Sequence, residues 1–112
     1  GTCGGNTNQL DVLSLESLTS PTLIKSYALD NPFGLSIDND LLFVCDGASG
    51  LKIFNAADVS NLVLKTTIRD IFPRDVIAIN GVAMVITDKG LYQYDYKDIN
   101  NIKLLSKIEI RK

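Results

Sequence analysis

The stretch PFGLSIDNDLLFVCDGASGLKIF, residues Pro32–Phe54, decides the fold of this chain. Its central run, Leu41–Cys45, is short and wholly apolar, as expected for a β-strand that is buried on both faces. The segments on either side, Asp38–Asp40 and Asp46–Gly50, consist of residue types that favour tight turns. The stretch therefore predicts three short strands that are joined by two turns.

The same pattern occurs again further along the chain. Gly50 has its counterpart in Gly90, 40 positions later, and Pro32 has its counterpart in Pro73, 41 positions later. The second copy is therefore one residue shorter, in the turn before Gly90. Counting backwards by the same interval places residues 8–31 on the end of an earlier, incomplete copy. A period of about 40 residues is typical of repeat architectures.

Each copy contains four expected strands. In one unit they lie at residues 34–38, 41–45, 51–55 and 63–69, and in the next at 75–79, 82–86, 91–95 and 103–110. Val82–Ile86 is apolar throughout, like its counterpart, and is also expected to be buried on both faces. Four antiparallel strands in about 40 residues are the pattern of a β-propeller blade.

We therefore predict an all-β fold of antiparallel four-stranded blades, forming one propeller-like region over residues 1–112. Residues 32–72 and 73–112 each form a blade, and residues 8–31 form the last two strands of another. Propellers close with at least about four blades, whereas this chain holds about two and a half. We expect it to be part of a larger protein or to complete its sheets through another chain.

Composition restricts the classes of partner. The chain has 112 residues, a net charge of −2 and no basic run, which argues against nucleic acid or an anionic membrane surface as a partner. No apolar stretch approaches the length of about 18 residues that a membrane-spanning helix needs.

The acidic residues are interpreted first as turn residues. The sequence contains no histidine, the commonest general base and zinc ligand. Asp38–Asp40 resembles the start of a calcium-binding loop but lacks the later ligands, so a hairpin turn is the favoured interpretation. Asp46 and Asp88 are likewise expected in turns.

Asp70, Arg74 and Asp75 lie close together in sequence at a boundary between units. Paired carboxylates there could act as acid and base, but a solvated loop is the favoured interpretation. We therefore predict a protein that is not an enzyme and that needs neither a metal nor a cofactor.

Three alternating tyrosines form the strongest candidate contact surface. Strand alternation places Tyr92, Tyr94 and Tyr96 on one face. Such a stripe could stack on sugars or anchor a protein partner, or it could pack against the next blade. Packing is favoured for Tyr94, which aligns with Phe54, and a contact role is retained for Tyr92 and Tyr96.

The two cysteines, Cys3 and Cys45, leave two alternatives open. A disulfide between them would close a loop of roughly 40 residues and stabilise the fold by about 4 kcal/mol. Cys45 lies in an apolar run, however, and a buried free thiol is the favoured interpretation from the residues alone.

The third strand of each unit resembles the Gly-Leu-x-Ile-x-Asp core of LVIVD-repeat proteins. The resemblance rests on Gly50–Asn55 and Gly90–Asp95, with an earlier copy at Leu10–Ser14. The phrases Asn31–Leu35 and Leu42–Gly47 resemble most closely the LVIVD-repeat lipoproteins that Bacteroidetes export, specifically their C-terminal part.

This resemblance implies a β-propeller-like fold and an exported protein that is held by a lipid anchor far upstream. It implies a place at the bacterial outer membrane or cell surface, with the periplasm as the alternative, and no assigned biochemical activity. An oxidising compartment also favours the pairing of Cys3 with Cys45.

The functional hypothesis is a non-catalytic binding or scaffold module that contacts an unknown protein or glycan. Exposed blade edges could also bring about self-association. The alternative is a fragment of a propeller enzyme, a hydrolase or lyase, whose active site needs blades outside this chain.

Overall fold

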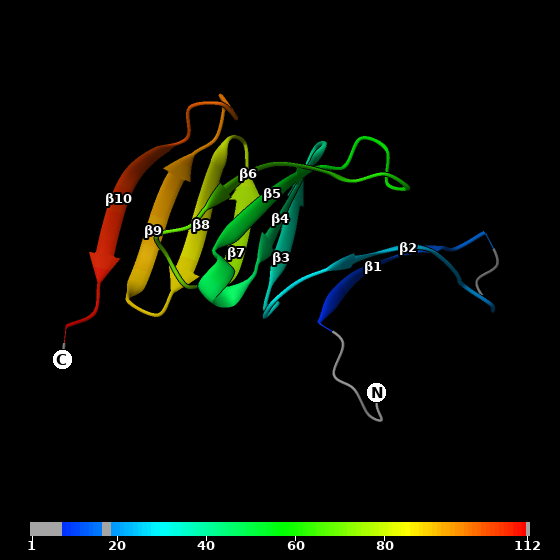
Figure 1. The fold of residues 1–112 in the computed structure, drawn as a ribbon. Helices are drawn as coiled ribbons and strands as arrows, with labels where there is room; N and C mark the ends of the chain where they lie inside the picture. The colour runs from blue at the N-terminus through cyan, green and yellow to red at the C-terminus, as the bar shows by residue number, and fades with distance from the viewer. Residues whose placement is uncertain (1–7, 17–18, 112) are drawn as a thin grey trace.

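The computed structural model of this protein describes residues 8–16 and 19–111. Within them, ten β-strands and one short 3-10 helix form two four-stranded antiparallel sheets and one hairpin (Figure 1). The prediction of an all-β fold with four-stranded antiparallel sheets is confirmed.

The N-terminal hairpin consists of β1 (Gln9–Ser14) and β2 (Thr22–Ala28). Its register shifts by a bulge between Val12 and Leu13. The backbone N–H of Leu29 donates to the carbonyl of Asn8 at 2.9 Å and so extends the pairing beyond the strands.

The middle sheet consists of β3 (Leu35–Asp38), β4 (Leu41–Cys45), β5 (Leu51–Asn55) and β6 (Val63–Ile68), hydrogen-bonded in chain order. The turn between β4 and β5 contains the 3-10 helix η1 (Gly47–Ser49). Each strand is joined to the next by a short connection that reverses the chain direction, so the sheet is a meander.

The C-terminal sheet has the same connectivity. Its strands are β7 (Pro73–Ile79), β8 (Val82–Thr87), β9 (Gly90–Asp95) and β10 (Lys103–Glu109), again in chain order. The chain passes from β6, at one edge of the middle sheet, to β7, which lies against β3 and β4.

The hairpin turn predicted at Asn80-Gly81 is confirmed. Both residues adopt positive φ, 52° and 86°, which is the backbone conformation that a tight two-residue turn requires. Asn39, in the corresponding turn between β3 and β4, also has a positive φ of 51°. An asparagine tolerates this conformation better than most residues.

The main core lies between the two four-stranded sheets. The middle sheet contributes Phe43, Cys45, Leu51 and Ile53, whereas the C-terminal sheet contributes small residues and aromatic rings. Buried residues of the C-terminal sheet and of its β9–β10 connection are Val76, Ala78, Ala83, Val85, Tyr92, Tyr94 and Tyr96. Both sheets thus contribute large side chains to a close-packed core, and the small ones, Ala78 and Ala83, come from the C-terminal sheet.

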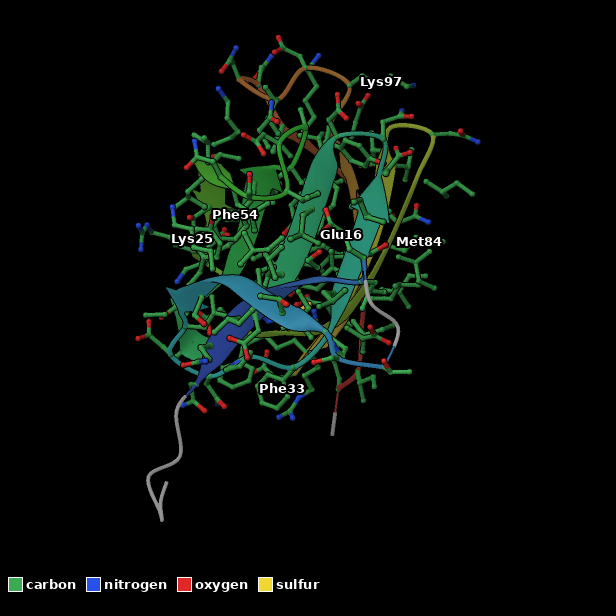
Figure 2. The ribbon with its side chains drawn as sticks, turned by 90° about the vertical axis from the view of Figure 1, so that its right-hand side faces the viewer. Glu16, Lys25, Phe33, Phe54, Met84 and Lys97 are labelled. Atoms are coloured by element: carbon green, nitrogen blue, oxygen red, sulfur yellow. The ribbon has the colours of Figure 1, made fainter. Side chains whose placement is uncertain are left out.

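A smaller core lies on the opposite face of the middle sheet, where the hairpin packs. Leu10, Val12 and Tyr27 of the hairpin lie against a cluster that includes Val44 and Phe54. In Figure 2 the hairpin crosses in front of only part of the middle sheet and leaves the rest of that face open.

The expectation that β8 is buried on both faces is wrong. The strand alternates between buried and accessible side chains, and Ile86 is 46% exposed. The reason is that the C-terminal sheet has a neighbouring sheet on one side only, among the residues the structure describes.

Candidate functional site

The tyrosine stripe is not a contact surface. Tyr92, Tyr94 and Tyr96 are only 5%, 6% and 4% exposed, because the middle sheet covers the face on which they lie. The prediction of a contact role for Tyr92 and Tyr96 is therefore wrong. The alternative, packing against the neighbouring sheet, describes all three rings.

The phenol of Tyr92 is tied to the edge strand of its own sheet. Its hydroxyl donates to the carboxylate of Glu109 at 2.7 Å, and the ammonium of Lys107 lies 5.4 Å from the ring centroid. This hydrogen bond raises the pKa of Tyr92 and lowers that of Glu109. Tyr92 thus fastens β9 to β10.

Tyr96 joins the two sheets. Its ring meets Phe43 edge-on with centroids 4.7 Å apart, and its hydroxyl donates to the carboxylate of Asp38. Burial raises the pKa of Tyr96 to about 12, and burial likewise raises the pKa of Tyr94 to about 12. Asp38 therefore has a structural partner, in addition to its place beside the β3–β4 turn.

Asp46 has a role that sequence reasoning missed. Its side chain is fully buried and accepts hydrogen bonds from the backbone N–H groups of Asp30, at 3.0 and 3.1 Å, and Asn31, at 2.7 Å. It also pairs with the ammonium of Lys52 at 2.7 Å. Burial opposes ionisation, but these three donors outweigh it and lower the pKa of Asp46. The carboxylate thus anchors the segment that links the hairpin to the middle sheet.

The C-terminal sheet lacks this arrangement. Thr87 stands at the position of Asp46, and Tyr92 at the position of Lys52. The hydroxyl of Thr87 serves its own turn, where it accepts from the N–H groups of Lys89 and Gly90 at 3.1 and 3.2 Å.

A cavity of about 320 Å³ lies beside Thr87 and Tyr92. Its charged lining residues are Arg69, Asp70, Asp88 and Lys89, so both signs are present in equal number. Asp88 thus lies in a turn, as expected, at the rim of this cavity.

The candidate acid–base cluster does not act as a unit. The guanidinium of Arg74 stacks at 5.7 Å from the ring of Phe33 and 5.3 Å from that of Phe72. Asp75 accepts from the backbone N–H of Val76 at 2.9 Å, while Asp70 lines the cavity described above. The three side chains have separate structural partners or surroundings. Arg74 and Asp75 lie on β7, so the interpretation as a solvated loop is wrong for them, whereas Asp70 lies in the connection between β6 and β7.

Cys45 is fully buried in the main core and has no disulfide partner within the described residues. Burial raises its pKa to about 11, so the thiolate that reacts with oxidants is suppressed. Cys3 lies outside the described residues. The disulfide between them therefore stays a prediction.

An accessible apolar surface is formed by the outer face of the C-terminal sheet, the face that points away from the middle sheet. The strand register places its side chains in rows across β7, β8, β9 and β10. Seven of them are apolar: Ile77, Ile79, Val82, Met84, Ile86, Leu91 and Ile108. Ile77, Ile79 and Ile108 are 56%, 55% and 65% exposed.

A second apolar surface lies at the other end of the molecule. A groove of about 350 Å³ lies along the boundary between the hairpin and the middle sheet, with Leu10, Val12 and Leu42 in its lining. Leu35 and Ile37, on the edge strand β3, are exposed there because the hairpin does not cover them.

No group of three or more cysteine or acidic side chains that could hold a metal occurs in residues 8–16 and 19–111. Nor does this part of the chain contain a helix long and apolar enough to cross a membrane. No protein-family model, curated protein or solved structure matches the chain.

Proposed function

We propose that this chain is a non-catalytic binding or scaffold module, part of a propeller-like assembly of blades. The observation that carries the proposal is the outer face of the C-terminal sheet, where seven apolar side chains form a continuous surface. Soluble monomers rarely expose apolar patches larger than a few hundred Å², and larger ones mark interaction sites.

The setting of this role is an exported, lipid-anchored protein of the bacterial outer membrane or cell surface. Support comes from the resemblance of Gly50–Asn55 and Gly90–Asp95 to the LVIVD repeat. The partner is a protein or a glycan, and contact with the membrane runs only through the upstream anchor. Self-association through open edges of blades belongs to the same proposal.

The competing function is that of a propeller hydrolase or lyase that draws its active site from further blades. The cavity beside Thr87 and Tyr92, with Asp70 and Asp88 in its lining, is the feature that favours it.

Screening the intact protein separates the two functions. Binding to a glycan array or to a surface-protein library, without turnover, is the expected result. Hydrolysis or elimination with a panel of glycosides and lactones, abolished by Asp70→Asn or Asp88→Asn, would overturn the non-catalytic role.

A further inference from the structure

We propose that the outer face of the C-terminal sheet is a dimerisation surface, packed against the same face of a second copy of this chain about a twofold axis. The inference rests on the proposed binding role and names the partner of that surface.

The middle sheet shows how such a face is used inside the molecule. By the repeat alignment, Met84, Ile86 and Leu91 of the outer face correspond to Phe43, Cys45 and Leu51. The latter three are fully buried, because the C-terminal sheet covers them. The outer face is thus the continuation of an interface that the chain already forms once.

The first strand of each sheet distinguishes the covered face of the middle sheet from the outer face of the C-terminal sheet. In the middle sheet, β3 presents two polar side chains. The hydroxyl of Ser36 accepts from the N–H of Ala78 at 3.0 Å, and Asp38 accepts from Tyr96. The outer face has isoleucines at the two corresponding positions, Ile77 and Ile79. A partner at this place must therefore be apolar rather than a donor of hydrogen bonds.

Within the described residues, a second copy offers an uncovered apolar face of a four-stranded sheet in only one place. Head-to-tail stacking would require that the outer face of one copy packs on the middle sheet of the next, on the side away from the C-terminal sheet. The N-terminal hairpin already packs on that side through Leu10, Val12 and Tyr27. The four-stranded face left uncovered on every copy, within the described residues, is the outer face itself. A contact between identical patches is closed and twofold, which is the commonest symmetry of soluble oligomers.

The polar groups of the outer face are compatible with this contact. Gln93 and Ser106, near its middle, satisfy each other through a hydrogen bond of 3.0 Å. Asp75 lies at the margin of the face on β7, and Asp95 pairs in register with Lys103 at another margin. The charges therefore lie at the margins, as in protein interfaces generally, and the two polar side chains nearer the middle have each other as partners.

The test is the molar mass of the 112-residue chain in solution, measured by light scattering and sedimentation over about 5 to 500 µM. We expect the mass to rise with concentration towards twice the 12.2 kDa of one chain. Ile77→Lys and, as a second variant, Ile86→Lys are each expected to shift the dissociation constant upward at least tenfold. Far-UV circular dichroism confirms that each variant is folded.

Val59→Lys is the matched control, since Val59 is 55% exposed against 56% for Ile77 but lines the groove at the other end of the molecule. It is expected to leave the association unchanged. A monomer at every concentration would overturn the proposal. Association that survives both isoleucine variants, or that Val59→Lys abolishes, would place the contact at a strand edge or in the groove and would equally overturn it. None of these outcomes bears on glycan binding or turnover, which test the proposed function separately.

Discussion

Asp46→Ala tests whether the buried carboxylate anchors the segment between the hairpin and the middle sheet. The substitution removes the acceptor of the N–H groups of Asp30 and Asn31 and leaves the ammonium of Lys52, which is only 17% exposed, without its partner. Removing one member of a buried ion pair costs about 3–5 kcal/mol, because the other charge remains unpaired. Asp46→Asn keeps one acceptor oxygen and is expected to cost about 1–3 kcal/mol.

Urea unfolding, followed by circular dichroism, measures both losses as a fall in the transition midpoint. Asp40→Asn is the control, because the side chain of Asp40 is exposed and makes no hydrogen bond or ion pair within the described residues. The control is expected to change the free energy of unfolding by less than about 0.5 kcal/mol. If Asp46→Ala costs no more than the control, Asp46 is not an anchor.

The same carboxylate predicts a dependence on pH. The pKa of Asp46 is lowered below its ordinary value of 3.8, so its stabilising contribution is complete above that value and is lost as the pH falls through the lowered pKa. Asp46→Asn removes the titrating group. We expect a shallower acid limb in the plot of unfolding free energy against pH, and an unchanged limb would contradict the assignment.

Three further predictions concern the core. Two of the four tyrosines, Tyr94 and Tyr96, should ionise near pH 12 in a spectrophotometric titration. Because their pKa values are raised, the free energy of unfolding should fall as the pH rises from about 10 towards about 12. Ionisation of all four tyrosines near pH 10 in the folded protein would contradict the burial of these two. Gly90→Ala should destabilise by more than about 3 kcal/mol in thermal or urea unfolding, since a Cβ atom there would lie 1.9 Å from the carbonyl oxygen of Ile108; a cost below about 1 kcal/mol would show that the strands can separate there. In a Cys3→Ser variant, Cys45 should react with a disulfide reagent only on unfolding. In the parent chain, unfolded without a reductant, the absence of any reactive thiol would establish the disulfide.

The strands could be predicted because their signals are local. Leu41–Cys45 and Leu51–Asn55 were expected from apolar runs between turn residues, and both appear with the expected bounds. Asn80-Gly81 forms its turn because few other pairs of residues adopt positive φ at both positions without strain. Each of these features depends on the residue and its immediate neighbours.

The candidate site could not be predicted in the same way, because exposure depends on neighbouring sheets. Alternation correctly placed Tyr92 and Tyr96 on one face, but it does not say which face another sheet covers. Asp46 lies in a stretch whose composition predicts a turn. Its role as a buried hydrogen-bond acceptor depends on N–H groups 15 and 16 positions earlier. One signal was present: Lys52 stands where the next repeat has a tyrosine, and a buried lysine requires a partner.

The exposed isoleucines also limit how strong the proposed dimer can be. Fully burying an isoleucine side chain stabilises by about 1.5–3 kcal/mol, so covering one that is already half buried gains roughly 1 kcal/mol. Ile77, Ile79, Ile86 and Ile108 are each about half exposed or somewhat more, which gives about 4 kcal/mol per copy and about 8 kcal/mol for the pair. Association costs an estimated 4–15 kcal/mol in lost translational and rotational freedom. The two terms are of similar size, so the contact should be weak and reversible, and its dependence on concentration is the property that identifies it. A charge at Ile77 must then be buried against an apolar surface, so a single lysine is enough to abolish association that is this close to balance.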